Sequence, residues 1–453
     1  MPVSAARAAA FDILLRAERE SSYASELLHS ATYEGLSSLD HALATELVMG
    51  VLRWRSRLDA DVAIASSQPL CKLDLEILIA LRLALYQFRW LDRVPQRAAL
   101  YESVELVKRA RKRSAAPFVN AVLRKLATAP RTPAADQPSS PEALARALAH
   151  PQWLVERWAR AYGLAAALEI CEHDQAIPVT AIRLRVRATG TSLPEVEQEL
   201  LKEGITLRPG ALLASARRIE AGDSTQTQAF RSGQIVIQDE ASQLVAALVG
   251  SGLQILDCCA APGGKTLAIA DHNPEAAITA VELHSHRARL LEKLLQPHAS
   301  RIQIVNADAQ HLPVSVQFDR VLADVPCSGT GTLARNPEIK WRLSLGDLAQ
   351  LHERQLAILR STLAQVAPGG RLVYSTCSLE KEENEDVVEQ ALSENDSFRL
   401  LDCRAELEQL KAAGKLTWSD PAALTRGPYL RTLPGVHPCD GFFAGILERR
   451  TGL

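Results

Sequence analysis

Two cysteines in this sequence follow apolar segments typical of buried strands. ADVPCSGTG, residues 323–331, carries Asp324 and Cys327, and YSTCS, residues 374–378, carries Cys377. A cysteine thiolate is a strong nucleophile whose reactivity depends on its pKa, so both thiols are candidates for covalent catalysis. A lone cysteine is more often a small buried apolar residue. The interpretation therefore depends on two cysteines that follow neighbouring strands.

A glycine-containing loop between a predicted strand and a helix indicates a ligand site. It reads DCCAAPGGKT, residues 257–266, and its glycines allow a ligand to approach the backbone. A phosphate-binding P-loop would need glycine where Cys259 stands, and the dinucleotide pattern G-x-G-x-x-G is absent. The expected binding residues of this loop are Cys259, Ala260, Ala261, Pro262, Gly263, Gly264 and Lys265.

Two acidic residues extend this candidate site. Glu282 ends the next predicted strand, where a carboxylate can accept hydrogen bonds from ribose hydroxyls, and Asp308 follows the third. Either acid alone is more often an ordinary exposed carboxylate at a strand end. Together with the loop they favour an adenosyl ligand without phosphates.

The elements that must position these residues lie in the C-terminal half. From Leu253 onward, apolar strands alternate with helical patterns, which predicts a mostly parallel, doubly wound sheet. Such sheets bind ligands beyond the carboxyl ends of their strands. The reactive residues fall at those predicted ends: Asp257, Glu282, Asp308, Asp324 and Cys377.

The rest of the chain divides by pattern. Residues 1–128 have helical periodicity, and the proline-rich stretch 129–141 is a predicted linker. Residues 142–232 mix helix and strand patterns and predict a small α+β module, in which Ser192 and Glu195 form a capping-box pattern. Residues 233–453 form the predicted Rossmann-like domain.

Composition limits the function classes. The net charge of the 453 residues is −2, so nucleic-acid binding must depend on local basic clusters, of which one stands out: Lys108, Arg109, Arg111, Lys112 and Arg113. Such a run is by itself more often a solvated helix face. No C-x-x-C pair or His cluster indicates a metal. No apolar run is long enough for a membrane span, and the amphipathic start does not resemble a signal peptide. We therefore expect a cytoplasmic protein without a metal.

The motifs together resemble a known family. DCCAAPGGK, ADVPCSGTG and VYSTCSLEKEEN resemble the motifs of the RNA cytosine-5 methyltransferases. RNPEIKWR at 335–342 and HPCDGFF at 437–443 resemble the bacterial branch that acts on 16S ribosomal RNA. Residues 97–126 resemble the NusB-type helical RNA-binding domain that precedes the catalytic domain there, and the middle module resembles an RNA-recognition-type fold.

The resemblance implies a role for each matching residue. Cys377 would be the nucleophile that adds to carbon 6 of cytosine, Cys327 the thiol needed for release, and Asp324 the group that holds the base. S-adenosylmethionine would lie against the loop 259–265, with Glu282 on its ribose and Asp308 on its adenine side. The substrate would be 16S ribosomal RNA, at the cytosine conventionally numbered 967, and the protein a monomer.

Three residues depart from the family pattern, and other functions stay open. Glu282 replaces the more usual aspartate, Cys439 replaces a glycine, and Arg187 stands where the middle module usually has asparagine. One alternative is a cytosine-5 methyltransferase acting on tRNA or at another ribosomal site. An amino-group methyltransferase would commonly have an Asn-Pro-Pro-Tyr type motif near Cys327. A third is a non-catalytic RNA-binding assembly or transcription factor, for which the two cysteines would be unnecessary.

Overall fold

The computed structural model describes residues 3–20, 22–129, 138–185, 192–312 and 317–452, so most of the predicted linker and Arg187 lie outside the described residues. The chain folds into two compact units. Unit 1 consists of Met1–Ile177 together with Leu333–Arg342, and unit 2 of Pro178–Thr332 and Leu343–Leu453. The ten residues of 333–342 thus belong to the helical unit although the chain on both sides belongs to unit 2.

Unit 1 is helical, as the periodicity predicts. Its α-helices are α1 (Ala5–Glu20), α2 (Ala24–Leu28), α3 (Ser38–Arg53), α4 (Arg55–Ala65), α5 (Leu75–Trp90), α6 (Gln96–Arg109), α7 (Ala116–Thr128), α8 (Pro141–Ala147), α9 (Gln152–Tyr162), α10 (Leu164–Gln175) and α16 (Ile339–Arg342). Leucine, isoleucine, valine and alanine from α1 to α7 form one core, because these helices place apolar residues on their inner faces. The Ser37 side chain accepts a hydrogen bond from Asp40 N and caps α3.

The segment 333–342 is held in unit 1 by buried polar contacts. Lys340 Nζ donates to Arg53 O at 3.0 Å and to Ala149 O at 3.1 Å. Trp341 Nε1 donates to Leu52 O at 2.6 Å. Lys340 is 1% exposed, so a charged side chain is removed from water inside the helical unit.

A small antiparallel sheet opens unit 2. Its order is β2 (Thr206–Pro209), β3 (Ala216–Ala221), β1 (Ala181–Leu184), β4 (Ile235–Ile237). Helix α11 (Leu193–Lys202) packs there, and its N-terminus carries the predicted capping box between Ser192 and Glu195. Val196 and Leu200 of α11 join a small core with Ile182 and Leu184. This is the α+β module that the sequence predicts.

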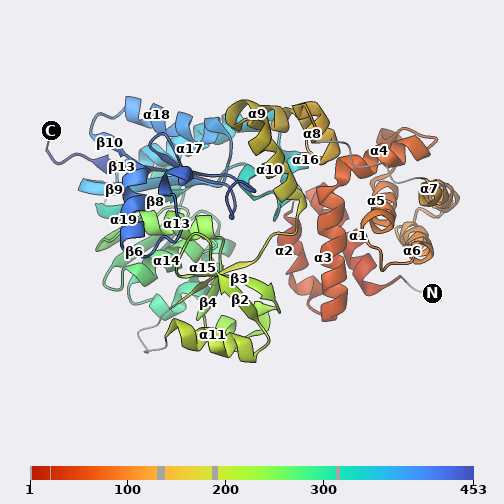
Figure 1. Ribbon diagram of the computed structural model, residues 1–453, viewed down its shortest axis with the longest axis horizontal. Coiled ribbons are helices and arrows are strands. Elements are labelled where there is room, and N and C mark those ends of the chain that lie inside the picture. The colour runs from red at the N-terminus through yellow and green to blue at the C-terminus, as the bar shows by residue number, and fades with distance from the viewer. Residues whose placement is uncertain (1–2, 21, 130–137, 186–191, 313–316, 453) are drawn as a thin grey trace. The chain divides into compact units, whose positions relative to one another are not determined.

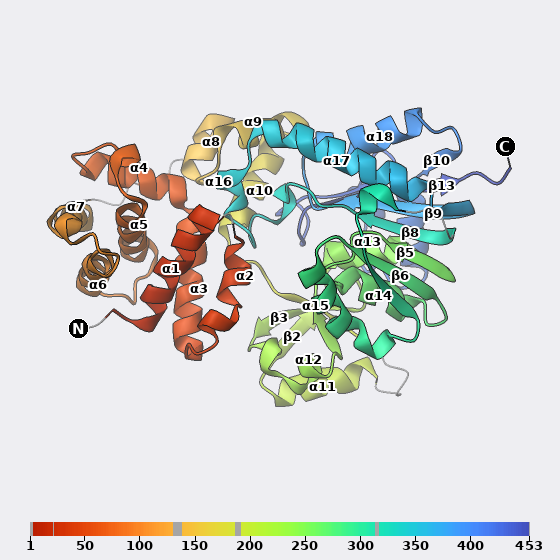
Figure 2. The same cartoon turned by 180° about the vertical axis from the view of Figure 1, so that it is seen from behind.

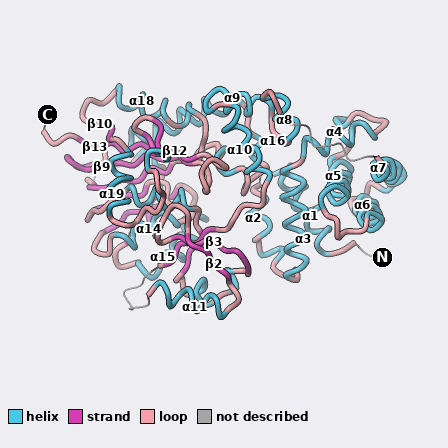
Figure 3. The backbone as a smooth tube through the Cα atoms, viewed as in Figure 1, coloured by secondary structure: helices cyan, strands magenta, loops and turns pink. Residues whose placement is uncertain are grey.

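The large sheet has nine strands, most of them in the order β11-β12-β13-β9-β8-β5-β6-β7, with β10 paired to β13. The pairs among β9, β8, β5, β6 and β7 are parallel, and β13 is antiparallel to β9. The strands are β5 (Gln254–Asp257), β6 (Ala277–Glu282), β7 (Ile302–Asn306), β8 (Phe318–Asp324), β9 (Val366–Thr376), β10 (Phe398–Leu401), β11 (Thr425–Arg426), β12 (Tyr429–Thr432) and β13 (Phe442–Arg449). They form the magenta group nearest the C-terminus in Figure 3.

Helices cover both faces of this sheet. One core contains residues of α13 (Glu240–Leu248), α14 (Gly264–His272), α15 (Ser285–Leu295) and α19 (Cys403–Ala412) together with Ile255, Leu322 and Val373. The other contains residues of α17 (Leu345–Leu363) and α18 (Glu385–Ser393) together with Leu256, Val321 and Leu372. Neighbouring strand residues therefore face opposite cores, as the pleat requires. Figures 1 and 2 show α17 and α18 along one side of the sheet. The predicted Rossmann-like class is confirmed.

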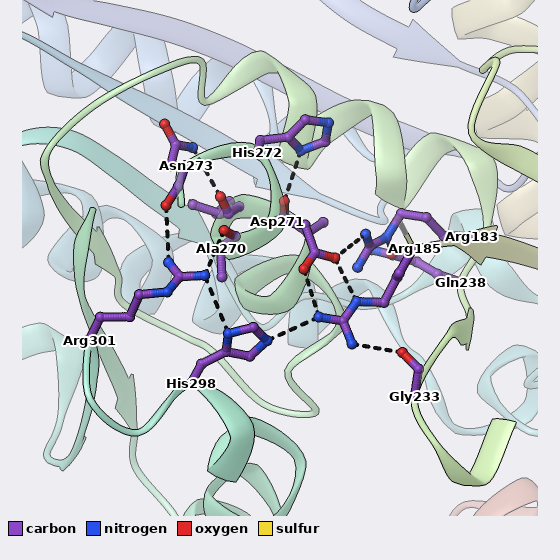
Figure 4. A network of polar contacts seen from close by, with 12 residues as sticks. Arg183, Arg185, Gly233, Gln238, Ala270, Asp271, His272, Asn273, His298 and Arg301 are labelled. Atoms are coloured by element: carbon purple, nitrogen blue, oxygen red, sulfur yellow. Dashed lines mark hydrogen bonds and ion pairs between the residues drawn. The ribbon is translucent and has the colours of Figure 1, made fainter. Parts of the chain in front are cut away.

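Two arginines of the small sheet bind the large domain rather than facing solvent (Figure 4). Arg183 Nη1 lies 2.6 Å from Asp271 Oδ2, and Arg185 pairs with both carboxylate oxygens of Asp271 at 2.6–2.7 Å. Arg185 Nη2 also lies 3.0 Å from His298 Nε2. Because both arginines are at most 7% exposed, this network joins the small sheet to α14 and holds the two parts of unit 2 together.

Candidate active site at the carboxyl ends of the parallel strands

The two predicted thiols lie in contact. Cys327 comes three residues after the end of β8 and Cys377 directly after β9, and these strands are parallel neighbours. Their Sγ atoms are 3.4 Å apart. The contact with Cys377, followed by burial, raises the pKa of the Cys327 thiol well above its ordinary value. The sequence thus brings two cysteines separated by fifty residues to one point, with Cys327 held as a protonated thiol.

A partly buried ion pair lies at the same strand ends. Lys265 Nζ is 2.7 Å from Asp324 Oδ2, and Ser375 Oγ donates to Asp324 Oδ1 at 2.7 Å. Lys265 Nζ also lies 4.9 Å from the centre of the Phe442 ring. Burial by itself lowers the pKa of Lys265, but the Asp324 carboxylate more than offsets it and raises that pKa above its ordinary value. Lys265 therefore keeps its charge at neutral pH.

The loop after β5 is held by backbone hydrogen bonds and contains glycines, the residues that let a ligand approach a backbone closely. Cys258 N donates to Leu322 O at 3.0 Å and Ala260 N to Val281 O at 2.9 Å, so the loop is fixed to both neighbouring strands. Gly263 has φ +105°, which L side chains rarely adopt, and a Cβ there would lie 2.7 Å from Leu291 and Leu294. At Gly264 an added Cβ would meet nothing closer than Gln238 at 3.6 Å. An alanine would therefore fit at Gly264 without a clash, unlike at Gly263.

Three further acids occupy successive strand ends. Asp257, fully buried, accepts a hydrogen bond from Thr266 Oγ1 at 2.6 Å, and burial raises its pKa to about 6. Glu282 ends β6 and accepts from His284 N at 2.8 Å. Asp308 lies two residues past β7, accepts from Gln310 N at 2.9 Å, and this backbone hydrogen bond lowers its pKa. The predicted strand-end acids thus follow β5, β6, β7 and β8 along one sheet edge.

The sequence interpretation missed several polar residues around the thiols. Glu383 is fully buried and accepts hydrogen bonds from Ser328 and Ser378, the residues that follow the two cysteines. Asn384 Nδ2 and Arg431 Nη1 both donate to Ser378 O, at 2.9 and 3.0 Å. The signal was in the quoted motif VYSTCSLEKEEN, whose last three residues include Glu383 and Asn384.

Two glycines explain part of the remaining motifs. Gly331 N donates to Cys377 O at 2.8 Å, and Gly441 N donates to Gly331 O at 2.8 Å. A Cβ on Gly331 would lie 2.2 Å from Gly441 O, so no larger residue fits there without a backbone shift.

Cys439 is 4% exposed, and burial raises its pKa well above the ordinary value. It is an inert buried thiol in this structure.

The basic cluster of unit 1 is partly neutralised. Lys108 pairs with Glu105 at 2.6 Å, Arg109 with Asp12 at 2.9 Å, and Lys112 with Asp74 at 2.8 Å. Arg111 and Arg113 follow the end of α6 and are exposed. No ion pair among the described residues involves either of these two arginines. They are the members of the cluster with charge available for a partner.

The described part of the chain shows neither a candidate metal centre nor a candidate membrane-spanning helix. Within it, no group of three or more His, Cys, Asp or Glu side chains is arranged to hold a metal ion. None of its helices combines the length and the apolar character that crossing a membrane requires.

Sequence families match all three parts of the chain. The 16S rRNA methyltransferase RsmB/F family matches residues 249–448, the NusB family residues 4–128, and a ferredoxin-like domain of RsmF/B-like methyltransferases residues 150–225. In structure the chain is similar to PH0851, with a TM-score of 0.80, 23% identity and 98% of each chain covered, which shows a shared fold. A methyltransferase homolog protein from Pyrococcus horikoshii covers 69% of this chain and 99% of its own, with TM-score 0.56 and 26% identity.

Curated relatives extend over nearly the full length. The probable ribosomal RNA small subunit methyltransferase B of Bacillus subtilis is 34% identical, with 99% of this chain and 100% of the relative covered. The ribosomal RNA small subunit methyltransferase B of Vibrio cholerae is 32% identical over 93% of this chain and 92% of its own. On this identity and coverage, and with the fold and motifs described above, the chain belongs to the RsmB/F family of 16S rRNA methyltransferases.

Proposed function

We propose that this protein methylates carbon 5 of a cytosine in 16S ribosomal RNA, through a transient bond between Cys377 and carbon 6 of the base. The observation that carries the proposal is the 3.4 Å contact between Cys327 and Cys377. The Lys265–Asp324 ion pair at the same strand ends supports it. A thiol nucleophile, a second thiol and a partly buried acid–base pair are the groups that this chemistry requires.

The residues at the sheet end fit S-adenosylmethionine, which supplies the methyl group when bound. Asp257 Oδ1 is buried and has no hydrogen-bond partner among the described residues. Glu282, at the end of β6, is the expected acceptor for ribose hydroxyls, with Asp308 on the adenine side and Cys259–Lys265 along the ligand. These donor and acceptor groups suit a nucleoside and provide no cluster of cations for phosphates. We propose that the reaction uses no metal ion.

In the addition step the Cys377 thiolate forms a bond to carbon 6. The electrons of the ring shift toward N3, which takes a proton from the Lys265–Asp324 pair, and carbon 5 becomes an enamine carbon that can accept the methyl group. In this proposal the Lys265 ammonium supplies the proton and Asp324 orients the base. Ser375 fixes the second oxygen of that carboxylate.

In the release step the proton on carbon 5 leaves to water, and its bonding electrons restore the ring. The carbon 6–sulfur bond breaks with its electron pair returning to Cys377, and N3 gives its proton back to the ion pair. Cys327 lies against Cys377 Sγ and is a protonated thiol, so it donates a hydrogen bond to the departing sulfur. Cys327 is therefore needed for release and not for attack.

For RNA recognition we propose the helical residues 1–128, with Lys108–Arg113 facing phosphates and Arg111 and Arg113 contributing most. The sequence predicts a middle module at 142–232, but α8, α9 and α10 belong to unit 1 and β4 (Ile235–Ile237) belongs to the small sheet. We propose that the middle module is the small sheet with α11, and that the catalytic domain follows it within unit 2. The names of the relatives favour 16S ribosomal RNA over tRNA, and we propose cytosine 967 as the target, with a monomeric protein acting in the cytoplasm. The base must leave its stack to reach both thiols.

Separating the two thiols tests the covalent mechanism. Cys377→Ala is expected to bind RNA yet neither methylate it nor form an adduct. Cys327→Ala is expected to attack and methylate once, then accumulate a protein–RNA adduct that survives denaturing electrophoresis. The double variant is expected to form none. The measurement is gel shift with labelled S-adenosylmethionine and ribosomal RNA.

Cys71→Ala, which removes an exposed thiol of unit 1, is the control and is expected to behave as wild type. An adduct that forms with Cys377→Ala and not with Cys327→Ala would reverse the assignment. Full turnover by both single variants would exclude a covalent mechanism. Mapping 5-methylcytosine in ribosomal RNA from a strain lacking the protein identifies the target base.

A further inference from the structure

A buried carboxylate connects the two turns that carry the thiols. Glu383 is fully buried, and its Oε1 accepts hydrogen bonds from Ser328 N at 2.8 Å and Gln355 Nε2 at 2.9 Å. Its Oε2 accepts from Ser378 Oγ at 2.5 Å and from Ser328 Oγ. Ser328 follows Cys327 and Ser378 follows Cys377 in the sequence. One side chain therefore ties the residue after each thiol to the same point.

The Cys377 turn has several other attachments. Asn384 Nδ2 and Arg431 Nη1 donate to Ser378 O, and Ser378 N donates to Thr376 Oγ1 at 3.1 Å. Arg431 is held in turn by Glu385, with both carboxylate oxygens at 3.0 Å. Loss of Glu383 would leave these contacts in place.

The Cys327 turn depends on Glu383 more strongly. Ser328 donates both its backbone N–H and its hydroxyl to Glu383, and its remaining side-chain contact is Ser378 Oγ at 3.0 Å. On the other side of Cys327, Gln355 Nε2 donates to Pro326 O at 3.0 Å, and Gln355 also contacts Glu383. Without Glu383, Ser328 N would be a buried donor lacking its partner, which drives the turn to shift.

We propose that Glu383 is a positioning residue for the release step, because it holds Cys327 against Cys377. The inference rests on the proposed function. Attack on carbon 6 needs Cys377, whose turn keeps its other attachments, whereas release needs the two sulfurs in contact. The charge of Glu383 also adds to the raised pKa of Cys327, after the contact with Cys377 and burial, and so keeps that thiol protonated.

The test compares formation and decay of the protein–RNA adduct. Glu383→Ala is expected to lower multiple-turnover methylation about tenfold, the effect of losing one charge-assisted hydrogen bond, while first-turnover methyl transfer falls less than about threefold. The adduct at steady state is expected to rise in the same proportion. Glu383→Gln keeps one acceptor oxygen and is expected to lie between Glu383→Ala and wild type.

Glu385→Gln is the matched control, because this carboxylate lies two residues away and acts only on the Cys377 side through Arg431. It is expected to slow adduct formation and to trap no adduct. Ser328→Ala removes the hydroxyl link on the Cys327 side and keeps the backbone N–H of residue 328 on Glu383. It is therefore expected to trap adduct to a smaller extent than Glu383→Ala, and it tests the inference if Glu383→Ala fails to fold by circular dichroism.

The outcomes separate this inference from the proposed function. If Cys327→Ala traps adduct but neither Glu383→Ala nor Ser328→Ala does, Glu383 is only a structural residue and the inference is wrong. Equal loss of first-turnover and multiple-turnover rates without adduct leads to the same conclusion. If Cys327→Ala itself traps nothing, the covalent mechanism fails first and the inference fails with it.

Discussion

Lys265 of unit 2 is partly buried and Lys340 of unit 1 is fully buried, and the two lysines differ in the group that lies opposite. In unit 2, Lys265 faces the Asp324 carboxylate at 2.7 Å, and its pKa is raised despite burial. In unit 1, Lys340 donates to two backbone carbonyls, and burial lowers its pKa to about 7, although Asp174 opposes this. A full negative charge offsets desolvation, and neutral carbonyl oxygens do so only in part.

The difference separates a reactive centre from a structural one. The lysine at the strand ends keeps its charge at neutral pH beside groups that can exchange protons with a substrate. The lysine among helices fixes a segment and is close to losing its proton. Substitutions at the strand ends should therefore change turnover, and those in the helical unit should change stability or RNA affinity.

The largest effect is expected for Lys265→Met. It removes the proton donor and the cation opposite Asp324, so turnover is expected to fall by about 100-fold to 1,000-fold, the usual range for a fixed electrostatic group. Rates under saturating RNA and S-adenosylmethionine measure it. Lys293→Met on the exposed face of α15 is the control. Turnover within about threefold of wild type would remove Lys265 from the reaction.

Glu282→Ala tests whether the same sheet edge binds the nucleoside. Losing charge-assisted hydrogen bonds of about 1.5–3 kcal/mol weakens S-adenosylmethionine binding roughly tenfold to 100-fold. Calorimetric titration measures the dissociation constant, and Glu275→Ala, at an exposed residue before β6, serves as control. Unchanged affinity would place the ribose elsewhere.

Lys340→Met tests the structural lysine through pH. Because the folded-state pKa of about 7 lies below the unfolded value of 10.5, the unfolded chain holds the proton between these values. Wild-type stability relative to the variant should therefore rise with pH from about 7 toward 10, by an amount on the order of 3 kcal/mol, and stay level below 7. His150 and Cys171 stay neutral at pH 7–9.5, because burial lowers the pKa of the histidine and raises that of the thiol.

Urea unfolding at pH 7 and 9.5 measures this effect. Tryptophan fluorescence reports mainly on unit 1, which contains five of the six tryptophans. A stability difference between wild type and variant that does not change with pH would mean that Lys340 stays charged in the folded protein. The rate of methyl transfer by the folded Lys340→Met variant at pH 7 should stay close to the wild-type rate, whereas its free energy of unfolding changes.

The smallest effect is expected on the surface of unit 1. Neutralising Arg111 and Arg113 together should reduce the log–log salt dependence of RNA binding by about 0.7 to 0.9 per lost phosphate contact. Neutralising Lys108 and Arg109 should reduce it less, because Glu105 and Asp12 already pair with them. Equal slopes for wild type and both double variants would make the cluster a solvated face.

The parallel part of the fold could be predicted because its signals are local. Apolar runs ending in an acid or a cysteine mark β5, β6 and β8, and parallel strands bring those ends to one edge. The fold class and the domain types followed from these patterns and from the resemblance. The contact between Cys327 and Cys377 could be expected for the same reason, since β8 and β9 are neighbours.

The rest of the fold and of the site depends on contacts between residues that are distant in sequence. Strand β3, ARRIEA, was missed because its arginines obscure the alternation, although Arg218 is held by Glu240 at 2.7 Å. Arg183 and Arg185 are buried against Asp271, about ninety residues away, and no local pattern indicates this contact. Glu383 carried no pattern of its own, because an acid in a motif does not reveal which turns it joins.

Because residues 333–342 belong to the helical unit, that unit cannot be exchanged as one continuous chain segment. The helical unit consists of two separate chain segments, so residues 1–177 alone lack the segment that contains Lys340 and Trp341. A gene fusion that replaced only residues 1–177 would combine a foreign N-terminal segment with the original residues 333–342. An exchange that preserves the contacts of Lys340 and Trp341 must therefore replace both segments together.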